Sequence, residues 1–315
     1  MKIYKHGTFW CIINLGNKHT KEGAMNEKLE LRKLLIYAIS VYRIPQKIKG
    51  MTDKRKRKGI PFFNLIMPVF MALLLQYESF HTFFSAPESM GRRFGNFIRG
   101  RIPKVDAVRD ALALLEADEV GDLLDSIVEK TYRNAVFRSG TIGGYTAAAV
   151  DGVELFSSTK KSCRKCLTRK NKAGQTEYFH RSVVCASIGH SPHVVLGQEM
   201  LTPRDGGEKD EGELTGGKRL VRDLHRKFGH FADVIVADAL YLNAPFLNTV
   251  LDCHMDAVIR LKDEERLIYK DAKGLFEKGE GRKDGFRRGR KRIEAWDTSG
   301  FEMEGVTVPL RVVRF

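Results

Sequence analysis

The sequence predicts an α/β protein in which a mixed sheet, with helices packed on its faces, follows an all-helical domain. Three observations lead to this prediction. Apolar residues recur at helical spacing as far as about Phe137. Beyond Gly144 the pattern changes to short, branched apolar runs separated by turn residues. The order of segments is then strand, strand, strand, helix, strand, helix, strand, which predicts an antiparallel meander that continues into helix crossovers.

Composition narrows the class of protein. The 315 residues are 43% hydrophobic, so the chain can bury a core, and 54 Lys and Arg against 39 Asp and Glu give a net charge of +15. Such an excess of positive charge favours a polyanionic partner, most commonly nucleic acid. The alternative is a solvated, lysine-rich surface. Five scattered cysteines are typical of a reducing cytoplasm and not of a secreted disulfide framework.

The helical domain is expected over residues 51–144, after an N-terminal extension, residues 1–50, that has no clear pattern. Its most apolar stretch, Pro61–Leu75, is interrupted by polar and proline residues and is too short to cross a bilayer, so we expect a buried helix and no membrane segment. Two further helices follow, with Asp118 capping the second. The glycine-rich segment Gly140–Gly144 then forms a joint.

Each element of the sheet follows from its own pattern. In chain order we expect a strand at Thr146–Val150, a hairpin of Arg181–Ile188 and His193–Leu201, a helix at Lys218–Phe228, a strand at Val234–Ala237, a helix at Ala244–Leu251 and a strand at Ala257–Ile259. The polar pair Asp151-Gly152 is expected to end the first strand in a turn. The run Val234–Ala237 is almost wholly apolar, which is typical of a strand buried on both faces.

Two aspartates stand directly after apolar strand runs. Asp151 follows the first predicted strand and Asp238 follows the fourth. A carboxylate at such a place is costly to bury unless something neutralises its charge. If the two strands are neighbours, both carboxylates reach one edge of the sheet and form an oxygen-ligand site for Mg²⁺ or Mn²⁺, ions that promote cleavage of a phosphodiester. The alternative is that each Asp only caps a turn or a helix.

Four segments resemble DDE transposases of bacterial insertion sequences. They are Ala149–Phe156 and Val236–Tyr241, which are similar to the first and second carboxylate motifs, together with Cys163–Arg169 and Tyr178–Arg181. The resemblance extends from about Ile60 to the end of the chain, and the element order is similar to the RNase H-like fold. It implies Asp151 and Asp238 as catalytic residues and as ligands of Mg²⁺ or Mn²⁺. It also implies DNA as the partner, a homo-oligomeric active complex, and a bacterial cytoplasmic, nucleoid-associated location without membrane contact.

The resemblance also implies a third metal-ligating carboxylate, a glutamate on a late helix that the chain does not reach. Residues 145–262 would then be an incomplete RNase H-like core, and residues 263–315 the start of a strand-rich insertion. Because the core would lack its final helix, poor solubility or partial disorder is expected after about Leu261. Three glutamates are weighed as substitutes. Glu154 and Glu199 are interpreted as structural or loop-facing, and Glu277, 39 positions after Asp238, is disfavoured because its surroundings show little helical pattern. The predicted function is therefore a DNA transposase, inactive as this chain alone. The alternatives are a non-catalytic DNA-binding remnant or repressor of the parent element, and a metal-dependent nuclease.

A second candidate metal site involves sulfur. Cys163 and Cys166 have the spacing of a zinc knuckle, and His180 follows fourteen positions after the second cysteine. The candidates for the fourth ligand that a structural zinc needs are His190, His193 and Cys185. One Cys-x-x-Cys pair without a defined fourth ligand favours reduced thiols packed near the core, so zinc is not expected.

Three basic clusters, Lys54–Lys58, Lys160–Lys172 and Arg282–Arg292, offer contacts to phosphates. The second cluster adjoins the first predicted strand, where DNA would lie if Asp151 is catalytic. The nucleic-acid-binding residues expected there are Lys160, Lys161, Arg164, Lys165, Arg169 and Lys170. For each cluster alone, a solvated loop is the alternative.

Overall fold

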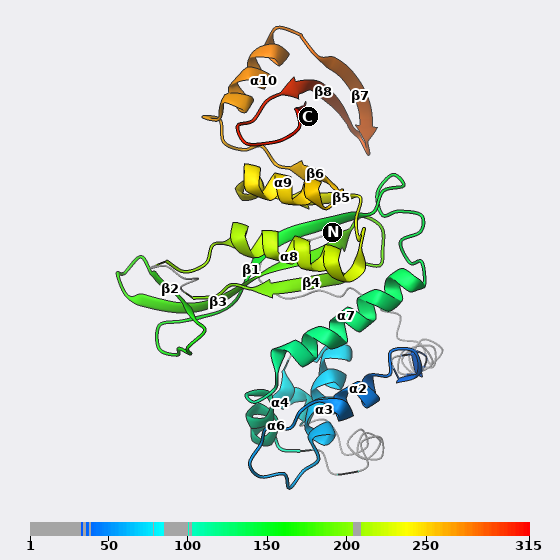
Figure 1. The fold of residues 1–315 in the computed structure, drawn as a ribbon, viewed down its shortest axis with the longest axis vertical. Coiled ribbons are helices and arrows are strands. Elements are labelled where there is room, and N and C mark those ends of the chain that lie inside the picture. Colours follow the sequence, from blue (N-terminus) through cyan, green and yellow to red (C-terminus); the bar gives the residue numbers. More distant parts are fainter. Residues whose placement is uncertain are drawn as a thin grey trace. The chain divides into compact units, whose positions relative to one another are not determined.

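The computed structural model describes residues 33, 36–37, 39–77, 79–84, 100, 103–203 and 209–315. It divides into two compact units, residues 1–130 and 131–315. Most of the N-terminal extension, Cys11 included, lies outside the described residues. The described part of the first unit is helical, and the second unit holds the mixed sheet (Figure 1).

Packed helices make up the described part of the first unit. They are α2 (Ile44–Gly50), α3 (Phe62–Leu74), α4 (Phe80–Phe84), α6 (Val105–Leu112) and α7 (Ala117–Arg133). Helix α3 packs against α2 and α6 and buries Leu65 and Met67, as its apolar sequence predicts. No helix among the described residues is long and apolar enough to cross a membrane. Asp118 lies in the first turn of α7 and not at its cap, because the helix already begins at Ala117.

The second unit is built on a six-stranded mixed sheet. Its strands are β1 (Ala147–Ser158), β2 (Leu167–Lys170), β3 (Thr176–Ile188), β4 (Val195–Met200), β5 (Val234–Ala237) and β6 (Asp256–Ile259). Strands β1, β2 and β4 pair antiparallel with β3, whereas β5 pairs parallel with β1 and β6 parallel with β5. The order β4-β3-β1-β5-β6 places three antiparallel strands beside two parallel ones. This is the RNase H-like arrangement that the element order predicts.

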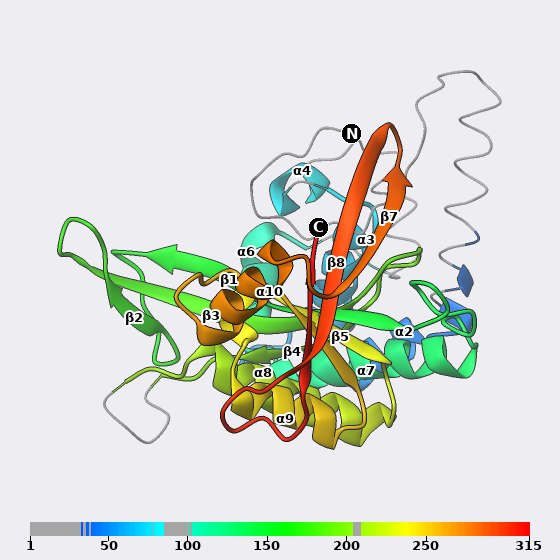
Figure 2. The same cartoon turned by 90° about the horizontal axis from the view of Figure 1, so that it is seen from above.

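Strand β1 is longer than predicted, because it does not turn at Asp151-Gly152. It continues to Ser158 paired with β3 alone, since its other neighbour, β5, ends at Ala237. The extension and β2 are mostly exposed and lack apolar alternation, so pairing with β3, and not burial, holds them in place. Together with the first residues of β3 they form a projecting ribbon, residues 153–181, which we call the arm (Figure 2).

Helix α8 (Glu213–Phe228) packs on β3 and β4 and lies beside α9 (Ala244–Asp252), which packs on β6 (Figure 1). It begins five residues earlier than predicted, because Gly216 and Gly217, which indicated a loop in the sequence, lie inside the helix. Their missing side chains allow close packing. A Cβ on Gly217 would lie 2.8 Å from the ring of Tyr241.

Residues 263–315 fold as a helix and a three-stranded antiparallel sheet. The elements are α10 (Leu267–Glu277), β7 (Arg282–Arg288), β8 (Lys291–Phe301) and β9 (Leu310–Arg314), with β8 in the middle of the sheet. Ala272 and Phe276 of α10 pack with Phe301 in a small core of their own. The strand-rich character is confirmed. Helix α10 packs against β8, and the poor solubility or partial disorder expected for this region stays a prediction.

Replacing Gly217 by Ala should destabilise the protein by about 1–3 kcal/mol, because the new methyl group meets the fully buried ring of Tyr241. The matched control is Gly274→Ala in α10. There a Cβ meets nothing within 4 Å, and the higher helix propensity of Ala should stabilise by about 0.5–1 kcal/mol. Urea unfolding followed by circular dichroism measures both changes. Equal stabilisation by the two substitutions would contradict the close packing of α8 on its neighbours.

Candidate functional site

The two predicted aspartates lie side by side where β5 ends. Strands β1 and β5 are adjacent and parallel, as predicted, and Val150 pairs with Ala237. Asp151 and Asp238 are the next residues on these strands, so their backbones are roughly 5 Å apart, the usual spacing of paired strands. Both side chains are exposed. The fold therefore presents two carboxylates to solvent at one point of the sheet.

Each aspartate uses one carboxylate oxygen locally. The Oδ1 atom of Asp151 accepts a hydrogen bond from the backbone N–H of Gly152 at 2.8 Å. The Oδ1 atom of Asp238 accepts one from the N–H of Leu240 at 2.9 Å and so caps the short 3₁₀ helix η1 (Ala239–Tyr241). The capping role that was the alternative for Asp238 is thus present. Within the described part of the chain, Oδ2 of either aspartate accepts no hydrogen bond, and each carboxylate keeps an oxygen for a ligand.

A third carboxylate, that of Glu213, lies against Gly152, the residue after Asp151, and was missed in the sequence. Glu213 opens helix α8, and its carboxyl carbon lies 2.2 Å from where a Cβ on Gly152 would be. The carboxylate thus occupies the space that any other residue after Asp151 would fill. In the sequence, Glu213 belongs to a glycine-rich polar segment without helical periodicity. The signal that would have found it is an acidic residue in the first turn of the helix that follows the β-hairpin.

The polar partners of Glu213 fix its position. The hydroxyl of Tyr241 donates to Oε1 at 3.3 Å, and Nη1 of Arg181 donates to Oε2 at 3.2 Å. Burial raises the pKa of the Tyr241 phenol far above its ordinary value, and the charges of Glu213, Asp151 and Asp238 raise it further. Tyr241 therefore remains a proton donor at every working pH. Arg181 and Tyr241 thus hold the carboxylate of Glu213, and the phenol of Tyr241 also lies within the electrostatic influence of Asp151 and Asp238.

The three glutamates that were weighed as the third metal ligand each form an ion pair. Glu199 pairs with Arg219 at 2.7 Å, and Glu154 pairs with Arg169 at 2.6 Å. Glu277, at the last residue of α10, is exposed and lies 4.0 Å from a lysine one turn earlier. A helix was not expected around Glu277, so that expectation is corrected. Each of these carboxylates therefore already has a basic partner.

A buried ion pair anchors the start of α8 and with it Glu213. The carboxylate of Glu211 is almost fully buried and accepts hydrogen bonds from the guanidinium of Arg219. It also accepts from the backbone N–H and the hydroxyl of Thr202, at 2.9 and 3.1 Å. Burial alone would raise the pKa of Glu211, but these donors outweigh it and hold the pKa below its ordinary value. The charged form of Glu211 therefore stabilises the fold.

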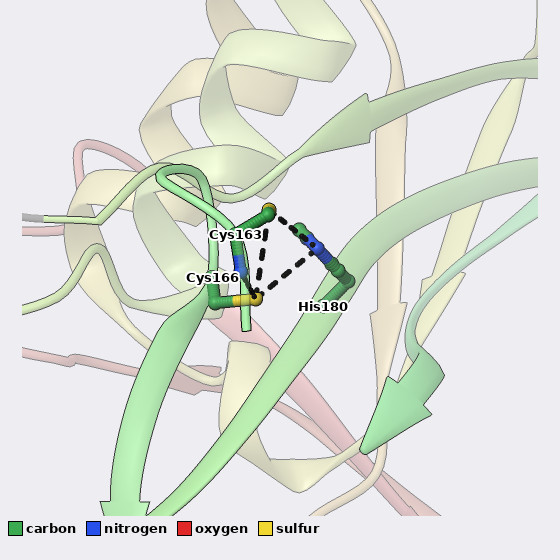
Figure 3. Close-up of side chains that lie close together, drawn as sticks. All are labelled: Cys163, Cys166 and His180. Carbon is green, nitrogen blue, oxygen red and sulfur yellow. Dashed lines mark hydrogen bonds between the residues drawn. The ribbon is translucent and has the colours of Figure 1, made fainter. Parts of the chain in front are cut away.

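The sulfur ligands proposed from the sequence do converge. Cys163 and Cys166 lie in the turn before β2, and His180 lies on β3 (Figure 3). The Nε2 atom of His180 is 3.3 Å from Sγ of Cys163 and 3.4 Å from Sγ of Cys166, and the two sulfurs are 3.6 Å apart. Both thiols are free, and Cys163 is exposed. The expectation that both pack near the core is therefore wrong for Cys163.

The fourth ligands considered in the sequence lie too far away. Cys185 is fully buried five positions beyond His180 on β3, a distance of about 16 Å along the strand. His190 and His193 follow the end of β3 and lie farther still. The described residues therefore supply three ligands at this place.

The basic residues of the arm fall into two groups. Lys160, Lys161, Arg164 and Lys165 are exposed in the turn that leads to β2, and none pairs with an acidic side chain in the described ranges. Arg169 differs, because it pairs with Glu154 and with Glu177 and lies over a phenylalanine ring at 4.5 Å. Its charge is used inside the arm, so the prediction that it contacts phosphate is not favoured. Lys170 is exposed and donates to a threonine hydroxyl on β3.

In each of the other two basic clusters, some side chains form ion pairs and most of the rest are exposed. In Lys54–Lys58, Arg55 is largely buried and pairs with Asp53 at 2.8 Å. The cluster Arg282–Arg292 forms the β7–β8 hairpin, where Lys283 pairs with a glutamate of β8 at 3.1 Å. Most of the remaining positive charge on both clusters is exposed.

Comparison with known proteins gives one distant structural similarity. No protein-family model matches the chain, and none of the curated protein sequences matches it. A chain in the cryo-EM structure of a piggyBac transposase synaptic complex with hairpin DNA is similar with a TM-score of 0.37 and 16% sequence identity. The match covers 84% of this chain and 57% of that one. At this level of similarity the function of that protein is not transferred, and the function of this chain has to be inferred from its own residues.

Replacing Glu211 by Gln should lower the free energy of unfolding at pH 7 by about 2–3 kcal/mol, because a buried carboxylate with charged partners is lost. The pKa of Glu211 is lowered in the folded protein, so its stabilising effect is present above the unfolded pKa and is lost as pH falls through the folded pKa. The difference between wild type and variant should therefore shrink on acidification below about pH 4.5, the ordinary value.

The control for this prediction is Glu199→Gln, which removes the more exposed carboxylate on the same Arg219 and should change stability by less than about 1 kcal/mol. Urea unfolding at pH 7 and at pH 4 measures both variants. A difference between wild type and Glu211→Gln that does not depend on pH would contradict a charged Glu211 in the folded state.

Proposed function

We propose that the chain is the RNase H-like catalytic region of a DDE-type DNA transposase, in which Asp151 and Asp238 hold a divalent metal ion. The observation that carries the proposal is the placement of two exposed carboxylates on adjacent parallel strands, one residue past the last pair. Like charges at this spacing repel each other. A cation between them removes the repulsion, which is why the pair favours a metal site over two independent turn caps.

The donor set fits Mg²⁺ or Mn²⁺. Hard divalent cations take carboxylate oxygens, and each aspartate has one oxygen outside its local hydrogen bond. When bound, such ions activate the attacking oxygen and stabilise the leaving oxygen of a phosphodiester. Glu213, oriented by Tyr241 and Arg181, adds a third negative charge against Gly152, next to Asp151 along β1. We assign it the role of strengthening cation binding, and the late-helix glutamate implied by the sequence resemblance remains a prediction.

The arm would hold DNA beside the carboxylates. Strand β1 runs without a break from Asp151 into the arm, where Lys160, Lys161, Arg164 and Lys165 are exposed. Positive side chains in such a turn neutralise phosphates and position the duplex. The sequence resemblance adds the expectations of a homo-oligomeric complex on transposon-end and target DNA, and of a bacterial cytoplasmic, nucleoid-associated location.

Asp151→Asn and Asp238→Asn should each weaken Mn²⁺ binding by about tenfold or more, equivalent to about 1.4 kcal/mol, because each removes a charged ligand. Glu213→Gln should weaken it less, since its oxygens already have partners. Electron paramagnetic resonance of Mn²⁺ titrated into the protein measures the affinity. The same variants should lose any Mn²⁺-dependent DNA cleavage.

The matched control is Asp256→Asn, because Asp256 is an exposed aspartate at the opposite end of the same parallel strands. Its Mn²⁺ affinity should equal that of the wild type. Equal Mn²⁺ affinity of the wild type, Asp151→Asn and Asp238→Asn would remove the catalytic proposal. Retained DNA binding with that result would favour a non-catalytic DNA-binding protein.

The logarithm of the affinity for duplex DNA should fall linearly with the logarithm of salt concentration, by about 0.9 per phosphate contacted. Replacing Lys160, Lys161, Arg164 and Lys165 together by Ala should make that slope shallower by about 2–4, because counterion release at these contacts is lost. Fluorescence anisotropy of labelled duplex DNA over a series of KCl concentrations measures the slope.

The control removes four exposed lysines from the α10 region. These are Lys262, Lys270, Lys273 and Lys278. Since the net charge changes equally, a shift confined to the arm variant identifies contacts and not a general field effect. Equal slopes for the arm variant and the wild type would show that DNA does not contact this turn.

A further inference from the structure

We propose that Cys163, Cys166 and His180 bind one zinc ion, which crosslinks the basic turn of the arm to β3. The site is separate from the carboxylates and does not depend on the transposase proposal. Three side chains from two segments bring their ligand atoms to within 3.6 Å of one another (Figure 3). No other group of histidines, cysteines and carboxylates in the described residues converges in this way.

The dimensions of the triangle match those of a tetrahedral zinc site. With Zn–S of about 2.3 Å and Zn–N of about 2.1 Å, two sulfur ligands lie about 3.8 Å apart and a sulfur and a nitrogen about 3.6 Å apart. The observed separations are 3.6 Å between the sulfurs, and 3.3 and 3.4 Å from the sulfurs to Nε2 of His180. Each lies within about 0.3 Å of the expected value. A sulfur separation of 3.6 Å is far too long for a disulfide.

The local backbone fixes the positions of both sulfurs. The N–H of Lys165 donates to Sγ of Cys163 at 3.3 Å, and the N–H of Cys163 donates to Sγ of Cys166 at 3.1 Å. Two thiolates and an imidazole are soft ligands that select zinc over Mg²⁺. Because Cys163 is exposed, the fourth coordination position faces solvent.

The arm has little else to stabilise it. Among its described residues 153–181, Cys166 and Leu167 are the buried ones, so no hydrophobic core holds the turn to the strands. His180 pairs with Phe156 across β1 and β3, and their rings lie 6.2 Å apart. Small folded segments that lack a core commonly depend on a bound metal. A zinc ion here would hold the basic turn in a fixed position on the ribbon.

The test measures metal in the 315-residue chain by mass spectrometry. About one zinc per chain is expected, and Co²⁺ in its place should give thiolate-to-metal charge-transfer absorption. Cys163→Ser and His180→Ala should each lose the metal and the absorption. Removal of the zinc by a chelator should accelerate tryptic cleavage after the lysines and arginines of the turn by about tenfold, since the crosslink is lost.

Matched variants separate this site from the rest of the protein. Cys253→Ala and His190→Ala change residues of the same types elsewhere and should keep the metal. Asp151→Asn with Asp238→Asn should also keep it, so a failure of the carboxylate proposal leaves this one standing. Zinc content in Cys163→Ser equal to that of the wild type, absence of metal and of Co²⁺ absorption in the wild type, or a bound metal other than zinc would each overturn the proposal.

Discussion

The candidate site lies where β5 ends while β1 continues, so the difference in strand length determines where its two aspartates stand. Over Ala147–Val150, β1 has a partner on each side, and beyond Val150 it keeps only β3. The residues at which the parallel pairing stops are aspartates on both strands. Their charges can be tolerated there because the missing neighbour leaves the side chains in water. Had β5 continued by two residues, Asp151 and Asp238 would lie within the sheet, where a pair of unneutralised carboxylates is strongly unfavourable.

Helix α8 determines where the acidic side chains of Glu211 and Glu213 lie. Its first residue, Glu213, fills the space above Gly152, and Glu211 two positions earlier is fixed by Arg219 and Thr202. The helix therefore starts at a defined point relative to β1, and its first acidic side chain has no freedom to turn away. Since Arg181 and Tyr241 are its partners, the carboxylates are only partly balanced. A cation would complete the balance.

The sequence predicted the sheet order and the aspartate pair because both follow from local pattern. An apolar run such as Val234–Ala237 identifies a buried strand, and a carboxylate directly after it identifies the strand end. Glu213 and the long ribbon were not predictable in the same way. The position of Glu213 depends on Gly152 of β1, which leaves room for its carboxylate. The ribbon depends on the pairing of exposed residues with β3. The cysteine–histidine cluster was visible as spacing, but its geometry depends on the register between β2 and β3.

The continuity of β1 has a mechanical consequence. One strand joins the basic turn to Asp151, and its pairing with β3 is irregular at one place, between Glu154 and Phe156. A force applied to the turn by a bound polymer would be transmitted along this strand as a twist, and the segment Ala147–Val150, which is paired on both sides, would resist that twist. The irregularity between Glu154 and Phe156 is the first place at which the twist can be relieved, and the end of β5 is the second. A load on the ribbon would therefore reach Asp151 only in part.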